Sequence, residues 1–225
     1  RPQVSVVIPV YNCALTLPSV IAALDKSIFQ DFETVLSHDF STDNTSEVLA
    51  DLAKHYQFRL FEFPENRGVS KARNAGALSA RGEIIVFIDA DCIVLPETIG
   101  MCVEQLRAGD SVCVGGAYTR AAWDKDFYSN FQSLYVHYVE TKTESPDYIA
   151  TPCMAIWKQT YDEFGGFLEA YFIGTAARAE DVEFSPSLRA TGPRTLHPYG
   201  LRVPDLFNFR PRNHLETATH KRNIE

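Results

Sequence analysis

The chain has 225 residues, enough for one large α/β domain or two small ones, and a chain of this size folds without disulfide or metal staples. Its 45% hydrophobic and 22% charged residues exclude disorder over most of its length. The 29 acidic and 21 basic side chains give a formal charge of −8, which argues against a general nucleic-acid binder but leaves room for one local anion-binding pocket.

Strands and helices alternate along the first half of the chain. Thr16 with Pro18 predicts the start of the first helix, Asp43 or Thr45 caps the second, and Gly82 ends the third. The predicted strands are residues 4–9, 33–37, 59–63, 83–88 and 112–115, and the predicted helices are residues 16–26, 43–55, 69–80 and 96–108.

The strand at residues 83–88 contains the run Ile-Ile-Val-Phe-Ile, which shows no polar alternation. Both of its faces are therefore expected to be covered, as in a parallel sheet. Four strand–helix alternations in about 115 residues predict a doubly wound, mainly parallel α/β sheet. In such sheets ligands bind at the carboxyl ends of the strands, so the residues that follow each strand are the candidates for a site.

The pattern changes after Gly116. An aromatic-rich helix is expected from Trp123 to Tyr138; a packed core is the default interpretation of its aromatic side chains, and a wall for stacking an acceptor is the alternative. A strand at residues 148–156, a helix at 158–164 stopped by Gly165-Gly166, and a helix at 180–190 interrupted by a proline follow. We expect one compact domain, with residues 1–116 as one half and residues 117–225 as the other.

Five cysteines without a C-x-x-C pair indicate buried thiols and a reducing, cytoplasmic setting. No run of about 18 apolar residues predicts a membrane span. The chain begins at Arg1-Pro2 without an initiator Met, as a fragment of a longer chain would. Association with the cytoplasmic face of a membrane therefore stays open.

Asp89-Ala90-Asp91 directly follows the most apolar strand. In an extended backbone residues i and i+2 point the same way, so both carboxylates would face one spot. Two like charges this close favour a shared cation, and hard oxygen ligands suit Mg²⁺ or Mn²⁺ beside a diphosphate. Solvated loop acids or a helix cap are the alternative, which the position after the central strand disfavours.

Other polar residues follow the remaining strands. Tyr11 and Asn12 come after the first strand, where main-chain groups can meet a base or ribose and Tyr11 can stack, although a plain turn is the alternative. Asp39 follows the second strand and can accept from a nucleobase N–H or a ribose hydroxyl. Arg67, Lys71 and Arg73 bring cations toward a phosphate, or form an ordinary exposed helix face.

Three absent patterns narrow the range of candidate functions. Neither the glycine-rich loop of P-loop ATPases nor a dinucleotide-binding G-x-G-x-x-G motif is present, and the six histidines have no metal-ligand spacing.

Glu180-Asp181 opens a predicted helix. Locally, these two residues are interpreted as acids that complement the helix dipole, and a general base is the alternative.

Taken in order, these segments resemble glycosyltransferase family 2, the inverting enzymes with the glycosyltransferase-A fold. The resemblance extends to about Gly192. The matching segments are residues 4–12 (VSVVIPVYN), 41–45 (STDNT), 66–68 (NRG), 72–76 (ARNAG), 82–83 (GE), 87–91 (FIDAD), 164–167 (FGGF) and 179–183 (AEDVE).

The resemblance implies a transferase that moves a sugar from a nucleotide sugar, with a UDP-sugar favoured, to a hydroxyl of a saccharide, lipid-linked or protein acceptor, with Mn²⁺ or Mg²⁺ as cofactor. It makes residues 1–116 the donor half and 117–225 the acceptor half of one catalytic domain. Asp91 looks like the direct metal ligand, assisted by Asp89, and Asp181 looks like the catalytic base. The implied donor-binding residues are Pro9, Tyr11, Asn12, Asp39, Arg73 and Asp89.

Three departures from the family pattern stand out. His38-Asp39-Phe40 replaces the usual Asp-Asp-Gly. A metal-ligating His often follows the Glu-Asp motif, and His197, His214 and Asp205 are its candidate counterparts here. Pro186 interrupts the helix that usually follows that motif.

Two other functions compete with sugar transfer. A sugar nucleotidyltransferase also pairs a nucleotide fold with acidic metal ligands, but it would carry a glycine-rich phosphate loop where this chain has Pro9-Val10-Tyr11-Asn12, and it would release pyrophosphate. A carbohydrate-binding protein with the same fold but without catalytic turnover would release neither pyrophosphate nor a nucleoside diphosphate.

Overall fold

The computed structural model describes residues 1–108, 113–116, 152–169 and 207–209, and seven helical residues between 127 and 138, namely 127, 130, 131, 134, 135, 137 and 138. The predicted helix at residues 180–190 lies outside the described residues, as do Trp123, Glu180, Asp181, Pro186, His197, Asp205 and His214.

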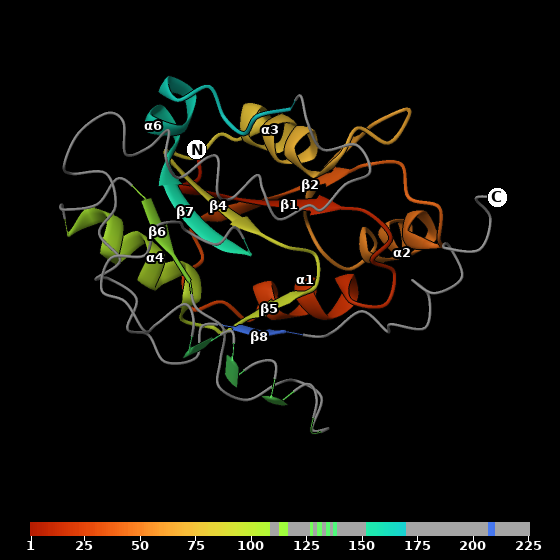
Figure 1. Cartoon of the computed structure of the whole chain (residues 1–225), viewed down its shortest axis with the longest axis horizontal. Coiled ribbons are helices and arrows are strands. Elements are labelled where there is room, and N and C mark those ends of the chain that lie inside the picture. The colour runs from red at the N-terminus through yellow and green to blue at the C-terminus, as the bar shows by residue number, and fades with distance from the viewer. Residues whose placement is uncertain are drawn as a thin grey trace.

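A six-stranded sheet forms the centre of the molecule, in the order β3-β2-β1-β4-β7-β6 (Figure 1). Its strands are β1 (Val4–Val10), β2 (Phe32–His38), β3 (Arg59–Glu62), β4 (Ile84–Ile88), β6 (Cys113–Gly115) and β7 (Cys153–Trp157). The helices are α1 (Leu17–Asp25), α2 (Thr45–Leu52), α3 (Val69–Ser79), α4 (Thr98–Arg107) and α6 (Lys158–Glu163). A second sheet pairs β5 (Cys92–Val94) with β8 (Phe207–Phe209).

The four strands β3, β2, β1 and β4 run parallel, and β7 joins β4 antiparallel. This confirms the predicted mainly parallel α/β sheet. β1 pairs with β4 only from Val4 to Val7, so Pro9, which has no N–H, lies beyond the end of that ladder. The strand order therefore places the carboxyl ends of β1, β2 and β4 next to one another.

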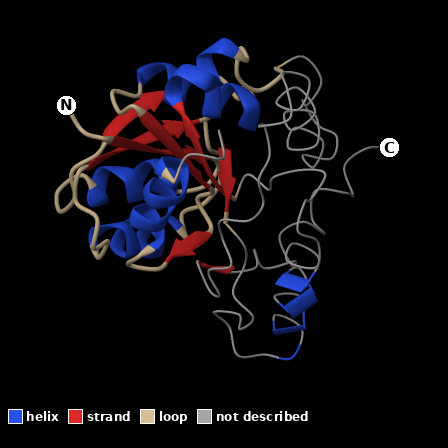
Figure 2. Cartoon of the chain, turned by 90° about the vertical axis from the view of Figure 1, so that its left-hand side faces the viewer, coloured by secondary structure: helices blue, strands red, loops and turns tan. Residues whose placement is uncertain are grey.

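Helices cover both faces of the sheet (Figures 1 and 2). On one face α1, α2 and α4 bury a core with the side chains of Val6, Ile8 and Val86. On the other face α3 and α6 pack on Val7, Ile85 and Phe87. Consecutive residues of β1 and β4 thus enter different cores, which is why these strands carry apolar residues without alternation.

Several predicted features differ in detail. Thr16 makes no side-chain cap for α1; its hydroxyl donates to the backbone oxygen of Ala90 (2.8 Å) instead. Gly82 does not end α3 through a left-handed turn. It is glycine because a Cβ there would lie 2.6 Å from the backbone carbon of Val4. The expected stop after α6 is confirmed, since Gly165 and Gly166 have φ of 78° and 75°.

The aromatic helix is the clearest correction. Phe127, Phe131, Tyr135 and Tyr138 are exposed rather than packed in a core, with Phe127 87% exposed. The first three stack on one another along the helix, with ring centroids 6.4 and 6.5 Å apart.

The described part of the chain contains no helix long and apolar enough to cross a membrane.

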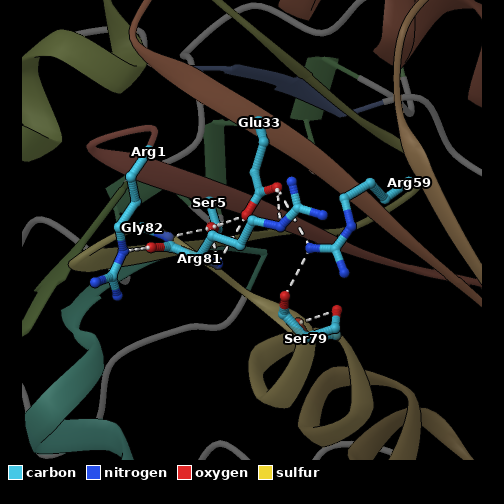
Figure 3. A network of polar contacts seen from close by, with 8 residues as sticks. Arg1, Ser5, Glu33, Arg59, Ser79, Arg81 and Gly82 are labelled. Carbon is cyan, nitrogen blue, oxygen red and sulfur yellow. Dashed lines mark hydrogen bonds and ion pairs between the residues drawn. The ribbon is translucent and has the colours of Figure 1, made fainter.

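A partly buried acid, Glu33, organises the amino-terminal edge of the sheet (Figure 3). Glu33 accepts hydrogen bonds from the Ser5 hydroxyl (2.8 Å), the Arg81 backbone N–H (2.7 Å) and the Arg59 guanidinium (3.4 Å). Burial would raise the pKa of Glu33, but these hydrogen bonds outweigh it and lower the pKa below its ordinary value. A cavity of about 560 Å³ adjoins Glu33, Arg59 and Arg81, at the edge opposite the predicted site.

Candidate functional site

The loops that follow β1 and β2 are tied together by hydrogen bonds at the carboxyl edge of the sheet. The Asn12 side-chain oxygen accepts the Thr42 N–H (2.7 Å), and the Asn12 N–H donates to the Ser41 hydroxyl (3.0 Å). The next backbone N–H, that of Cys13, donates to the Thr45 hydroxyl (3.0 Å). Asn12 therefore fixes the relative position of the two loops, and its N–H, one of the main-chain groups expected to meet a nucleotide, is bonded within the protein.

Asp39 is 2% exposed and holds the loop that follows β3. One carboxylate oxygen accepts the Arg67 N–H (2.6 Å) and the other accepts the Gly68 N–H (2.8 Å). A carboxylate has about four acceptor positions, and these two hydrogen bonds occupy two of them. The structure thus places Asp39 at the predicted edge and adds a structural role that the sequence did not reveal.

His38 is buried at the last position of β2. Its Nε2 accepts the Ser41 N–H (3.2 Å), which assigns the ring proton to Nδ1, and Nδ1 lies 3.2 Å from Glu62 Oε1. His38 therefore links β3 to the Ser41 loop. The sequence already marked position 38 as unusual, since His38 stands where the family usually has aspartate.

Asp89 and Asp91 flank a tight turn between β4 and β5. The Cys92 N–H donates to the Asp89 carbonyl (3.0 Å), which closes a four-residue turn. The extended-backbone argument for two parallel carboxylates is therefore wrong, because the chain reverses here instead of continuing as a strand. Both acids nevertheless lie at the carboxyl end of the central strand.

Arg73 of α3 contacts Asp89. Its guanidinium donates to Asp89 Oδ1 (2.8 Å), and the side chain of Arg73 is 3% exposed whereas that of Asp89 is 27% exposed. The guanidinium carbon also lies 5.4 Å from the ring centroid of Phe167. The structure thus brings together Arg73 and Asp89, both predicted site residues. The other predicted cations, Arg67 and Lys71, pair with Glu65 and Glu169.

The acids at this turn fit a hard divalent cation. Asp91 is partly exposed, and carboxylate oxygens are the ligands that Mg²⁺ and Mn²⁺ prefer. Among the residues that the structure describes, no group of three or more His, Cys, Asp or Glu could hold a metal alone. One or two carboxylates together with substrate phosphates and water is the usual way that Mg²⁺ is held in phosphate sites.

Asn74 is a residue that sequence reasoning matched to a motif without giving it a role. Its side-chain oxygen accepts the Tyr161 hydroxyl (2.6 Å) and the Phe167 N–H (2.9 Å), and its amide donates to the Phe167 carbonyl (2.8 Å). A Cβ at Gly166 would lie 2.7 Å from this side-chain oxygen. Asn74 therefore anchors the Gly165–Phe167 turn on α3, one residue from Arg73.

The model of glycosyl transferase family 2 matches residues 5–164, which span the whole edge described above. The chain belongs to this family. Among curated proteins, it is 32% identical over 127 residues to glycosyltransferase GlyG of Streptococcus pneumoniae, covering 56% of this chain and 42% of GlyG. It is 29% identical over 119 residues to dolichol-phosphate mannosyltransferase of Pyrococcus furiosus, covering 52% of this chain and 34% of that enzyme. The chain thus spans less than half the length of these relatives.

Solved structures agree on the fold. Mannosyltransferase PcManGT from Pyrobaculum calidifontis, in complex with GDP-Man and Mn²⁺, superposes with a TM-score of 0.73 at 23% identity, covering 97% of this chain and 60% of that one. TarS from S. aureus in complex with UDP-GlcNAc gives 0.67 at 20% identity, covering 96% and 61%. The family 2 chain therefore has the glycosyltransferase-A type fold, as its sequence predicts.

Proposed function

We propose that this family 2 chain is a metal-dependent, inverting glycosyltransferase that moves a sugar from a nucleoside-diphosphate sugar to an acceptor hydroxyl. The observation that carries the proposal is the Asp89–Arg73 pair beside Asp91, at the carboxyl end of β4 in a sugar-transferring family. Two structural neighbours were solved with nucleotide sugars, one of them with Mn²⁺, which supports both the donor class and the cofactor.

Each described residue has a distinct task in this proposal. Asp91 holds the cation directly and Asp89 assists it, oriented by Arg73. The cation, when bound, supplies Lewis-acid charge that stabilises the departing diphosphate. Asp39 keeps the Arg67–Gly68 loop in place beside the donor.

The acceptor side rests on the family resemblance. Asp181, which lies outside the described residues, is proposed as the general base that removes the acceptor proton. A single displacement by the acceptor oxygen then inverts the anomeric centre, and the second carboxylate, Glu180, is the competing base.

We favour a uridine diphosphate donor. Tyr11 offers a ring for stacking and Asp39 an acceptor for the N–H of the base. The neighbours carry different bases, a UDP-sugar in TarS and GDP-Man in the mannosyltransferase, so likeness in fold does not choose between them. The preference therefore rests on Tyr11 and Asp39.

A donor screen with Mn²⁺ tests the function. UDP-, GDP- and dTDP-sugars are incubated with the protein, and the released nucleotide is identified by chromatography with and without chelator. Metal-dependent release of UDP is the expected result. Pyrophosphate release would instead identify a nucleotidyltransferase, and an absence of release from every donor, with sugar binding retained, would identify a binding protein.

A further inference from the structure

Phe40 adopts an unusual backbone conformation at the carboxyl edge of the sheet. Its φ is 53°, in the left-handed region that a bulky aromatic residue rarely adopts. The other positive-φ residues at this edge are Asn12 and Gly68, which tolerate the region. Phe40 thus carries backbone strain where glycine or asparagine would carry less.

The surrounding bonds explain why the strain persists. Asp39 is fixed by two backbone N–H groups and Ser41 is fixed by His38, so the residues on both sides of Phe40 are held. Burial of the ring does not offset the strain, because Phe40 is 52% exposed. The fold alone therefore gives no reason for a phenylalanine at this position, and a strained residue beside a site points to function.

The backbone of Phe40 lies beside that of Tyr11. The Asp39 N–H donates to the Val10 carbonyl (2.8 Å) and the Asn12 N–H donates to the Ser41 hydroxyl (3.0 Å), so these two bonds bracket the backbone of Tyr11 and Phe40. Tyr11 is 38% exposed. Two partly exposed aromatic residues therefore end adjacent parallel strands at the edge where ligands of such sheets bind.

We propose that Phe40 is a binding residue for the nucleobase of the donor, forming with Tyr11 an aromatic surface against which the base ring lies. This rests on the proposed nucleoside-diphosphate donor. Base–aromatic stacking tolerates any base, so Phe40 adds affinity for the base ring while Asp39 offers the hydrogen-bond acceptor. The unfavourable backbone conformation of Phe40 is then offset by a contact that forms only in the complex with the donor.

The test uses Phe40→Gly, which removes the ring and relieves the strain together. We expect the parent to bind UDP with Mn²⁺ in calorimetry and the variant to bind it at least about fivefold more weakly. Binding of pyrophosphate with Mn²⁺, which offers the diphosphate without a base, should be unchanged. The melting temperature should not fall, and Phe40→Tyr should restore UDP affinity.

Leu78→Ala is the matched control, because Leu78 is an exposed apolar residue near the far end of α3 and should leave UDP binding unchanged. Equal UDP affinity in Phe40→Gly and the parent would overturn the inference while leaving the proposed function standing. Loss of UDP and pyrophosphate together, or a lower melting temperature, would make Phe40 a structural residue. A parent that binds neither UDP nor GDP would contradict the proposed donor itself.

Discussion

Asp89 and Asp91 stand two positions apart in one motif, yet their environments differ. Asp89 is paired with Arg73, whose side chain is almost fully buried, so this acid also satisfies a charge in the interior. Asp91 is partly exposed on the far side of the tight turn. A charge buried at Arg73 would be costly without its partner. The two acids should therefore respond differently to the same substitution.

Asp91→Asn is predicted to abolish metal-dependent turnover while leaving the fold intact. Lewis-acid stabilisation contributes several kcal/mol, so we expect a loss of about 100-fold or more in turnover rate. Asp89→Asn should in addition lower the free energy of unfolding by about 1.5–3 kcal/mol, because the buried Arg73 guanidinium then faces a neutral acceptor instead of a carboxylate. Denaturant titration and turnover of both variants provide the measurement, and full activity of Asp91→Asn in chelator would contradict the assignment.

Glu33 gives a prediction for pH dependence. Its pKa is lowered in the folded protein, so its contribution to stability is fully present above the ordinary value of 4.5 and is lost as the pH falls through the lowered value. Glu33→Gln should therefore be less stable than the parent at pH 7, by about 1 kcal/mol or more. The difference should shrink below about pH 4.

Unfolding by urea between pH 3 and 7 measures this difference. Glu104→Gln, a change of an exposed acid on α4, is the control and should shift stability little at any pH. A Glu33→Gln deficit that stays constant across the range would contradict the role of the ionised carboxylate.

At the scale of elements, α3 connects the carboxyl edge of the sheet to the chain that leaves α6. Arg73 reaches Asp89 and its neighbour Asn74 holds the Gly165–Phe167 turn. The helix can sit this close to the sheet because of Gly76, where a Cβ would lie 2.3 Å from the Val7 side chain. Displacing α3 would therefore disturb both contacts at once.

Asn74→Ala is predicted to destabilise the protein by about 2–4 kcal/mol. The hydrogen bonds to the Tyr161 hydroxyl, the Phe167 N–H and the Phe167 carbonyl would be lost, and each contributes about 0.5–1.5 kcal/mol. Asn74→Asp keeps the acceptor oxygen but turns a second oxygen toward the Phe167 carbonyl and the Glu169 carboxylate, which are both acceptors, so it should be destabilised as well. Denaturant unfolding ranks the three proteins, and equal stability of Asn74→Ala and the parent would contradict the anchoring role.

Sequence patterns predicted the strands of the main sheet well, because long apolar runs such as residues 84–88 bury both faces whatever surrounds them. The short strand β5 was not predicted. Its partner, Phe207–Phe209, lies more than 100 residues away, and such pairing leaves no local signal. The turn at Asp89–Cys92 was read as extended for the same reason, since nothing in the motif itself reports where the chain reverses.

At the scale of the whole molecule, polar residues lie at both ends of the parallel strands, but the two groups differ in their roles. At the amino edge Glu33, Arg59 and Ser5 satisfy one another, which fits a structural role. At the carboxyl edge lie Asp39 and the Arg73–Asp89 pair, as expected for residues that follow the strands of a parallel sheet. Their hydrogen-bond partners were not predictable, because they depend on how loops distant in sequence meet.

A reaction needs the acceptor half as well, and the last prediction concerns its base. Asp181→Asn keeps the size of the side chain and removes its basicity, so the turnover rate should fall by about 10²–10⁴-fold, the usual contribution of general-base catalysis. UDP affinity should be nearly unchanged, because the residues that we propose to bind the donor are a different set, at the carboxyl ends of β1, β2 and β4 and on α3. Glu180→Gln is the matched control and should affect turnover less.

Turnover with a competent acceptor, measured beside UDP affinity by calorimetry, separates the outcomes. Normal turnover of Asp181→Asn would place the base elsewhere. Loss of UDP binding together with turnover would instead make Asp181 part of the donor site or of the fold.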